Sequence, residues 1–428
     1  MKRLLSIVLA LSLAIVLPQR ISAQEISAAT LYEIVEGVYE YKCAQCGGDY
    51  MSSEEFCVNA GSSANTDWYA FIAGRLGKSG DGYIDALGTY MNKWYSSGRL
   101  GTSNPTEWER MSLAVMSLGG DVTHVGVDAE GNSINLIADA TFEHDKFMAV
   151  EDMLINGLDY ALISMDAYDD YVGDDHSDYI DKLLDAILGM ELVDGGFALM
   201  GGAADVDITA MTVTALSAHM DDERVKACVD RCISWLSEAQ RDTGYYMNCG
   251  YENAESCAQV VIALSCVGVD AGFDERFIKN GVSVLDALLS FRMEDGGFAH
   301  AITESVKSNE LATIQSAIAV MAYYRYLNGQ GSIYNFEKYD GGLADTDETE
   351  PDSSEVFVTV PNGQENVQSE ASAETELVYE ENTEQLQSVE GEESAGNGNL
   401  VYYIVFAVVI LGITAMVYMK KHGKVEEE

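Results

Sequence analysis

Residues 194–219 read DGGFALMGGAADVDITAMTVTALSAH, and two later stretches follow the same plan. They are residues 242–268, DTGYYMNCGYENAESCAQVVIALSCVG, and residues 295–324, DGGFAHAITESVKSNELATIQSAIAVMAYY. Gly196, Gly244 and Gly297 correspond in this alignment, at spacings of 48 and 53 residues. A period of about 50 residues indicates a repeat array in which each unit is one helical hairpin.

Each repeat has the same internal order. An amphipathic helix such as residues 223–240 or 281–293 is followed by an Asp-Gly-Gly-aromatic turn, in which glycine permits a positive φ. An acid or Asn then starts a second helix that is almost wholly apolar. An all-round apolar helix is a buried one, so we expect the amphipathic helix to cover it.

The same order extends towards the N-terminus. Buried helices are predicted at residues 67–77, 105–120 and 152–165, with outer partners at 31–45, 81–98, 178–190 and, with a poorer pattern, 132–149. Strand signals are scarce. The sequence therefore predicts an all-α domain over residues 24–339, an α/α toroid of six inner helices ringed by six outer helices.

The two ends of the chain predict export and anchoring. Residues 1–23 have two basic residues, an apolar core and a small-residue cleavage site, which is typical of a signal peptide. Residues 340–399 carry 17 acids and no base, so we expect a disordered acidic stalk. Residues 400–419 are uncharged and long enough for one transmembrane helix, and the lysines that follow place the tail, 420–428, in the cytoplasm.

The charge and the cysteines narrow the range of partners. The formal net charge is −46, which argues against nucleic acid as a partner. Eight cysteines are present, and Cys43, Cys46 and Cys57 lie close together in the sequence. In an exported chain these three are as consistent with a disulfide as with free thiols.

The chain resembles the prenyltransferase and squalene-cyclase (terpenoid cyclase) repeat superfamily, specifically its exported surface proteins from Gram-positive bacteria. The stretches that carry the resemblance are GAADVDITAMTVTAL, ENAESCAQVVIALSCVGVD, RFIKNGVSVLDALLSFRMEDGGFAH and PTEWERMSLAVMSLGGD. QRDTGYY, from Gln240, is similar to the Gln-x-x-x-Gly-Trp repeat signature of that superfamily. The resemblance covers roughly residues 30–335 and implies a toroid, a fold that hosts enzymes and non-catalytic carriers alike.

The resemblance also raises the question of catalysis. A class II cyclase carries an Asp-x-Asp-Asp motif whose middle acid protonates an alkene, and here Asp205-Val206-Asp207-Ile208 lacks the last acid. Asp207, with Asp205 beside it, is the catalytic candidate only under that interpretation. Carboxylates at helix N-termini also cap free amides, which is the simpler interpretation of this stretch. The histidines match no prenyltransferase zinc site, so we expect neither a metal nor a cofactor.

A non-catalytic, membrane-anchored binding or interaction module is the function that these observations favour. Its partner is left open among a small molecule such as a corrinoid, a glycan and a protein. The corrinoid alternative comes from a distant similarity to the transcobalamin-like toroid. The alternative function is a terpene-cyclase-like or carbohydrate-active enzyme that uses carboxylates at the inner-helix mouth. The ligand-binding candidates are Asp67, Trp68, Glu107, Trp108, Asp205, Asp207, Glu255, Gln259 and Gln315.

Overall fold

A computed structural model describes residues 26–98, 104–143, 149–302 and 306–339. They all belong to one compact unit, Met1–Asp347. The predicted signal peptide, stalk, transmembrane helix and tail lie outside the described residues. Within the described ranges, no helix is both long and apolar enough to cross a membrane.

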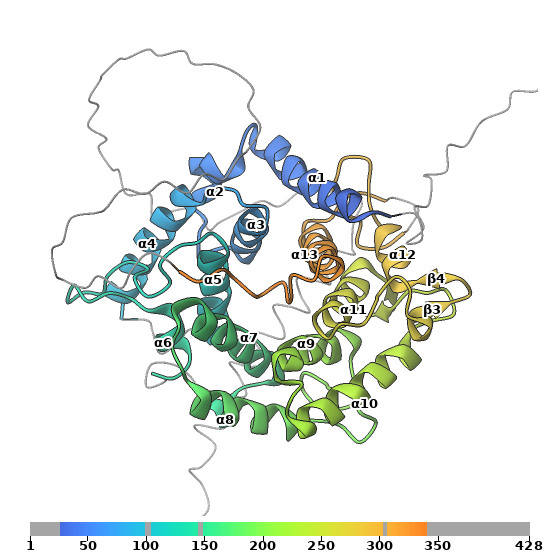
Figure 1. The fold of residues 1–428 in the computed structure, drawn as a ribbon. Coiled ribbons are helices and arrows are strands. Elements are labelled where there is room, and N and C mark those ends of the chain that lie inside the picture. Colours follow the sequence, from blue (N-terminus) through green and yellow to red (C-terminus); the bar gives the residue numbers. More distant parts are fainter. Residues whose placement is uncertain (1–25, 99–103, 144–148, 303–305, 340–428) are drawn as a thin grey trace, which may run out of the picture. The chain divides into compact units, whose positions relative to one another are not determined.

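Six helices form the inner layer of this unit (Figure 1). Each inner helix contacts the next one along the chain, and the last contacts the first, which closes a ring. The predicted set of six inner helices is therefore confirmed. Their bounds are α3 (Ala64–Arg75), α5 (Pro105–Ser117), α7 (Ile155–Val172), α9 (Val206–Leu216), α11 (Ala254–Cys266) and α13 (Glu310–Leu327).

Outside this ring lies a second layer of helices that is less regular than the first. The outer helices are α1 (Ala28–Cys46), α4 (Asp81–Ser96), α6 (Leu136–Ala140), α8 (Ser177–Leu188), α10 (Glu223–Ala239) and α12 (Val284–Leu289). Two of them are shorter than expected. The poor pattern at 132–149 gives only the five-residue α6, and the predicted helix 281–293 is reduced to α12 because the hairpin β3 (Ile278–Lys279) and β4 (Val282–Ser283) takes its first residues. The loops of the ring also contain the short helix α2 (Glu54–Cys57), a second hairpin, β1 (Met247–Asn248) with β2 (Tyr251–Glu252), and short 3-10 turns.

Neighbouring inner helices run parallel and in register. Thr212 of α9 donates a hydrogen bond to Asp159 of α7, and His219, just beyond the end of α9, forms a hydrogen bond with Asp166 of α7. The two residues of each pair are 53 positions apart in the sequence. Gln259 of α11 likewise meets Gln315 at the same depth in α13. Because the inner helices are parallel, their N-termini lie together on one face of the ring. We call this face the N-terminal rim.

The repeated turn packs each inner helix against an outer one. Phe197, Tyr246 and Phe298 occupy the same position and are fully buried. The positive-φ glycines of the three turns are Gly195, Gly244 and Gly296, with φ of 85°, 87° and 93°. The sequence alignment, which matched Gly244 with Gly196 and Gly297, was therefore displaced by one residue, because the second turn carries a single glycine.

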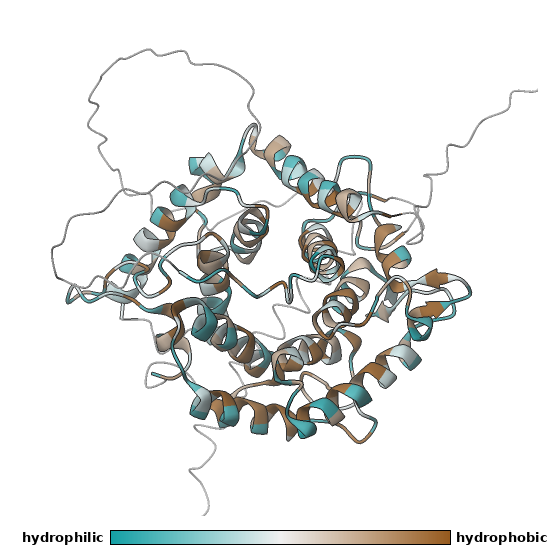
Figure 2. Ribbon diagram, in the orientation of Figure 1, coloured by the Kyte–Doolittle hydropathy of each residue, from teal (hydrophilic) through white to brown (hydrophobic). Residues whose placement is uncertain are grey.

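In Figure 2, apolar residues dominate the ribbons of α9 and α11, and polar residues alternate with apolar ones along α8 and α10. The inner helices α9 and α11 are mainly apolar, whereas the outer helices α8 and α10 are apolar on one side and polar on the other. This is the division that the sequence predicted. All eight cysteines lie in described residues and are free thiols, so no disulfide joins Cys43, Cys46 and Cys57.

Residues 328–339 cross the ring at the C-terminal ends of the inner helices (Figure 1). The ring of Tyr334 contacts Phe71 of α3, and the backbone N–H of Tyr339 donates to the Tyr171 carbonyl of α7 at 2.9 Å. Arg75 donates to the Asn335 carbonyl at 3.1 Å. The chain itself therefore covers part of the C-terminal face, and the candidate site lies at the opposite rim.

Candidate functional site

Capping side chains fix the backbone of the N-terminal rim. Ser63, Asn104, Asp205, Asn253 and Asn309 each accept a hydrogen bond from a free amide in the first turn of an inner helix. Such caps contribute about 1 kcal/mol each. Asp205, the first acid of the stretch at 205–208, is therefore a helix cap, as the simpler interpretation of this stretch predicted.

Asp67 is fully buried and fully occupied. Its Oδ1 accepts from the Gly61 amide and the Tyr83 hydroxyl, both at 2.8 Å, and its Oδ2 accepts from Arg110 Nε at 2.9 Å. Burial raises the pKa of Asp67, and the Arg110 charge acts in the opposite direction. The Asp67 carboxylate therefore links α3, α4 and α5. Both of its oxygens already accept hydrogen bonds within the wall, so neither is left unpaired for a ligand.

The two tryptophans of the candidate set are placed differently. Trp108 is 1% exposed, and its Nε1 donates to the Tyr95 hydroxyl at 3.0 Å, inside the wall of the ring. Trp68 remains partly exposed, with its ring 6.0 Å from that of Tyr160 on α7. Of the two, only Trp68 presents an aromatic surface beside the rim.

Asp205 and Asp207 form a carboxyl pair. One amide holds both, because Asn248 Nδ2 donates to Asp205 Oδ2 at 3.0 Å and to Asp207 Oδ2 at 2.9 Å. Asn248 ends β1 of the hairpin that precedes α11, which carries it to the start of α9. We call Asp205, Asp207 and Asn248 the carboxyl-pair site.

Asp207 is the unusual member of this site. Its Oδ1 atom is buried and has no hydrogen-bond partner. Burial, together with the Asp205 charge, raises the pKa of Asp207 to about 6. The Ser256 hydroxyl lies near this carboxyl and acts to lower its pKa. A carboxyl with this pKa changes its protonation state close to neutral pH, which is a property of functional sites.

Two further rim acids are paired. Glu255 is 4% exposed, and both of its oxygens lie within 2.9 Å of His300 Nδ1. This hydrogen bond raises the pKa of His300. Glu310 of α13 accepts from Lys42 at 2.6 Å and from Asn65 at 3.0 Å. These contacts close the ring, since they join α13 to α1 and to α3.

The two glutamines predicted to face a ligand face each other. Gln259 Nε2 donates to Gln315 Oε1 at 3.3 Å, and both side chains are partly exposed. Glu107, the last candidate, is also partly exposed, and burial raises its pKa. The structure thus brings together Asp205 and Asp207, leaves Trp68 and Glu107 partly exposed, and encloses Asp67 and Trp108 in the wall.

Sequence reasoning missed the residues that hold the rim acids, and it did not anticipate that two carboxyls are buried in the walls. Asn248 forms hydrogen bonds with Asp205 and Asp207, and His300 forms them with Glu255. The sequence feature that could have identified Asn248 and His300 is their position in loops that precede inner helices. Glu109 and Asp159 are fully buried carboxyls in the walls, and burial raises the pKa of each well above its usual range. Both oxygens of Glu109 and one oxygen of Asp159 have no hydrogen-bond partner.

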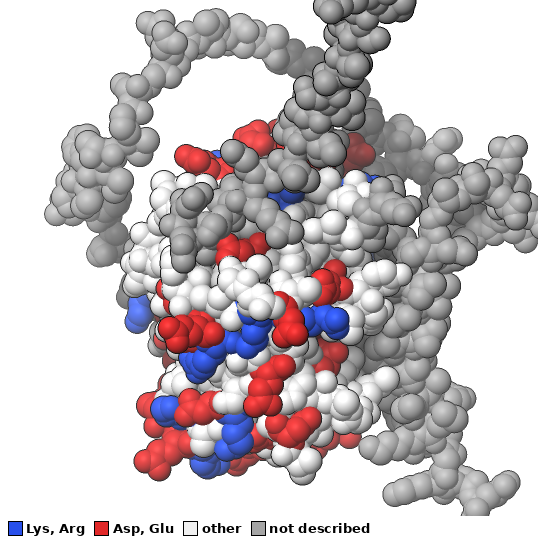
Figure 3. Space-filling view, turned by 90° about the vertical axis from the view of Figure 1, so that its right-hand side faces the viewer, with Lys and Arg blue, Asp and Glu red and all other residues white. Residues whose placement is uncertain are grey.

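The charges on the described surface are mixed. Figure 3 shows acidic side chains scattered among basic ones on the side that faces the viewer. No group of three or more His, Cys, Asp or Glu side chains is placed to hold a metal ion in the ranges that the structure describes.

No protein-family model matches the sequence, and no curated protein matches it. Among solved structures, the chain is similar to the unsaturated glucuronyl hydrolase of Bacillus sp. GL1, with a TM-score of 0.49 and 11% identity over 72% of this chain and 99% of that one. It is also similar to the ent-copalyl diphosphate synthase of Streptomyces platensis, with a TM-score of 0.38 and 15% identity over 62% of this chain and 50% of that one. At these values neither similarity bears on the activity of this chain, and the toroid is assigned from its own helix contacts.

Proposed function

We propose that this protein is an exported, membrane-anchored binding module, and that its toroid holds a glycan at the carboxyl-pair site. The observation that carries the proposal is the Asp207 carboxyl, with one oxygen held by Asn248 and the other buried without a partner. A buried acceptor without a donor is costly, and a ligand hydroxyl would satisfy it. The anchor comes from the sequence of residues 1–23 and 340–428.

The hairpin beside the site supplies an apolar surface. Met247 is 45% exposed and Tyr251 is 56% exposed, and both belong to the short strands that position Asn248. The ring of Tyr251 also contacts the His300 imidazole, at 6.3 Å between ring centres. Sugar-binding sites need acceptors for hydroxyls and an exposed aromatic face, which is why we favour a glycan over a corrinoid or a protein partner.

Native mass spectrometry of the full-length protein in detergent micelles tests this proposal. The protein is offered fragments of cell-wall glycan, cobalamin and calcium chloride in separate samples. We expect an added mass with a glycan fragment, lost in the double variant Asp205→Ala with Asp207→Ala. Glu33→Gln, which changes an exposed acid on α1, is the matched control and should keep the added mass.

Three outcomes would contradict the proposal. A glycan mass that survives in the double variant would move binding to another part of the chain. A mass added only by cobalamin would assign a corrinoid instead. If the protein shows no added mass under any condition, a protein partner would remain as the ligand of the carboxyl-pair site.

A second function is favoured by one observation, the pKa of about 6 at Asp207. A carboxyl that is partly protonated near neutral pH is suited to act as a general acid. Incubation with a glycan, and separately with squalene, followed by mass analysis of the products, tests this alternative. Turnover that disappears in Asp207→Asn while binding persists would make the protein an enzyme, and unchanged substrate would retain the binding function.

A further inference from the structure

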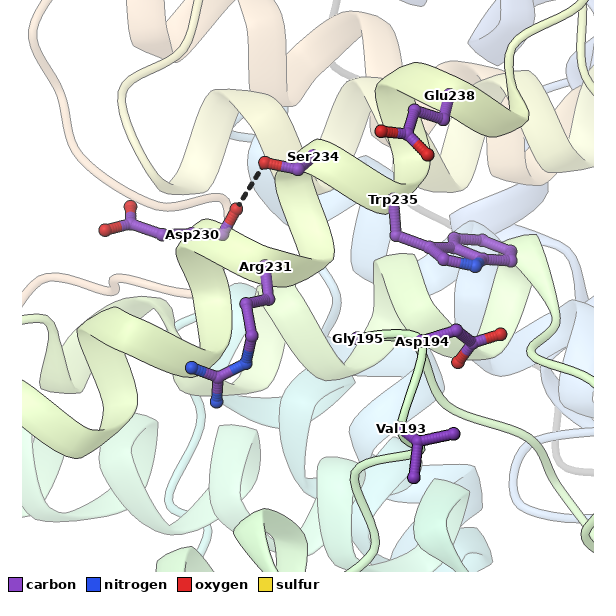
Figure 4. Close-up of a pocket in the computed structure, with 8 residues that line it drawn as sticks. All are labelled: Val193, Asp194, Gly195, Asp230, Arg231, Ser234, Trp235 and Glu238. Atoms are coloured by element: carbon purple, nitrogen blue, oxygen red, sulfur yellow. Dashed lines mark hydrogen bonds between the residues drawn. The ribbon is translucent and has the colours of Figure 1, made fainter.

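A separate pocket lies on the outer surface, between α10 and the first Asp-Gly-Gly turn. Its volume is about 370 Å³, within the range of small-ligand sites. The partly exposed indole of Trp235 forms one wall, and the exposed Val193 stands at its edge. Figure 4 shows the pocket, which is lined by Val193, Asp194, Gly195, Asp230, Arg231, Ser234, Trp235 and Glu238.

Two of the charged residues in this pocket are already paired with neighbours. Arg231 donates to both oxygens of Glu191, at 2.5 and 2.6 Å. Asp230 accepts from Lys226, one turn earlier on α10, at 2.6 Å. Neither residue therefore has to find its counter-charge in a ligand.

The other two acids lack a cation. Within the described residues, Glu238 has no ion pair or hydrogen bond, and the Asp194 side chain accepts one long hydrogen bond, from the Gly196 amide at 3.4 Å. In the view of Figure 4 the indole of Trp235 lies between these two side chains. The pocket thus combines an aromatic face with two carboxylates whose charge is not compensated.

The repeat supplies an internal comparison. Asp295 occupies the position of Asp194 in the third turn, and there Gly296 packs on α1 as Gly195 packs on α10. Asp295 accepts from the Gly297 amide at 3.0 Å and from the Ser308 hydroxyl at 2.6 Å. The shared turn therefore does not prevent its aspartate from forming short hydrogen bonds. The single long hydrogen bond of Asp194 is a property of this pocket.

We propose that this pocket binds an alkylammonium group, with the cation over the Trp235 ring, its N–H groups towards Asp194 and its alkyl chain along Val193, while Glu238, on the other side of the indole, adds negative charge. The contribution of a cation over tryptophan is small at an exposed site, and so is that of exposed carboxylates. The dissociation constant for a free ammonium is accordingly expected at roughly tens to hundreds of millimolar. The source of the group is either a free amine or a lysine side chain of a peptide, since both present the same chemistry.

Fluorine NMR of the full-length protein labelled with 5-fluorotryptophan tests the proposal. The protein has four tryptophans, and the Trp235 signal is identified by its loss in Trp235→Phe. The probe is n-butylammonium chloride, compared with n-butanol and with potassium chloride at equal ionic strength. A Gly-Lys-Gly peptide forms a second arm that distinguishes a peptide source from a free amine.

We expect n-butylammonium to shift the Trp235 signal saturably and to leave the other three unchanged. Asp194→Asn with Glu238→Gln changes only exposed side chains and should raise the dissociation constant about fivefold or more. Asp295→Asn is the matched control and should titrate like the parent protein. An equal shift with butanol or potassium chloride, or an unchanged constant in the double variant, would overturn the proposal.

Discussion

The rim of α3 and the rim of α9 both carry an aspartate in the first turn of an inner helix, but the two carboxyls have different surroundings. Asp67 meets the Arg110 guanidinium and two further donors, so its charge is balanced inside the wall. Asp207 meets one neutral amide and another acid, so its charge is opposed. An aspartate in the first turn of an inner helix thus has its charge balanced in one repeat and opposed in another.

The largest expected effect is at the structural acid. Asp67→Ala leaves the Arg110 charge, which is 13% exposed, without a partner in the wall. Removing one member of a buried ion pair costs about 3–5 kcal/mol, so we expect the free energy of unfolding in urea at pH 7 to fall by that amount. Asp85→Ala removes an exposed acid of α4 and should change it little. A loss below that seen for Asp85→Ala would show that the Asp67 ion pair does not support the fold.

The next effect is a pH dependence at Asp207. Its pKa of about 6 in the folded protein exceeds the value of about 3.9 in an unfolded chain. The folded state therefore binds the extra proton between these values, and the stability contribution of Asp207 falls as pH rises from about 4 to about 6.

Asp207→Asn removes this dependence. The difference in unfolding free energy between the variant and the parent should grow in favour of the variant over that range, by at most about 3 kcal/mol. Urea unfolding at several pH values between 4 and 7 measures it. A constant difference across the range would mean that the pKa of Asp207 is not raised.

The smallest effect concerns the amide that joins the pair. Asn248→Ala removes the donor to Asp207 Oδ2 and should raise the pKa of Asp207 further, by up to about one unit, because the hydrogen bond favours the charged form. Carbon-13 NMR titration of the labelled carboxyl measures this pKa. Asn328→Ala, at the exposed end of α13, is the control. A pKa that stays in place would show that Asn248 positions the pair without acting on its charge.

Much of the fold could be predicted from the sequence because its signals are local. The apolar pattern of α9, α11 and α13 and the capping residues before them lie within a few residues of the helices that they specify. The failures also have local causes. Asp152 lies in a short 3-10 turn before α7, and the start of the predicted helix at 281 became a hairpin because Asn280 and Gly281 adopt positive φ. The carboxyl-pair site was identified at Asp205 and Asp207, but its third member, Asn248, has no recognisable motif.

The sequence by itself determined the repeat, the pairing of a buried helix with a covering one and the acids at the helix starts, since each depends on neighbours along the chain. The tertiary structure decided which of those acids are balanced. Their partners lie about one repeat away, 43 residues for Asp67 with Arg110, 41 for Asp207 with Asn248 and 45 for Glu255 with His300. Whether that partner is a guanidinium, an amide or an imidazole determines how far the negative charge of each carboxyl can be balanced, because electrostatic interactions depend on distance through space and on burial.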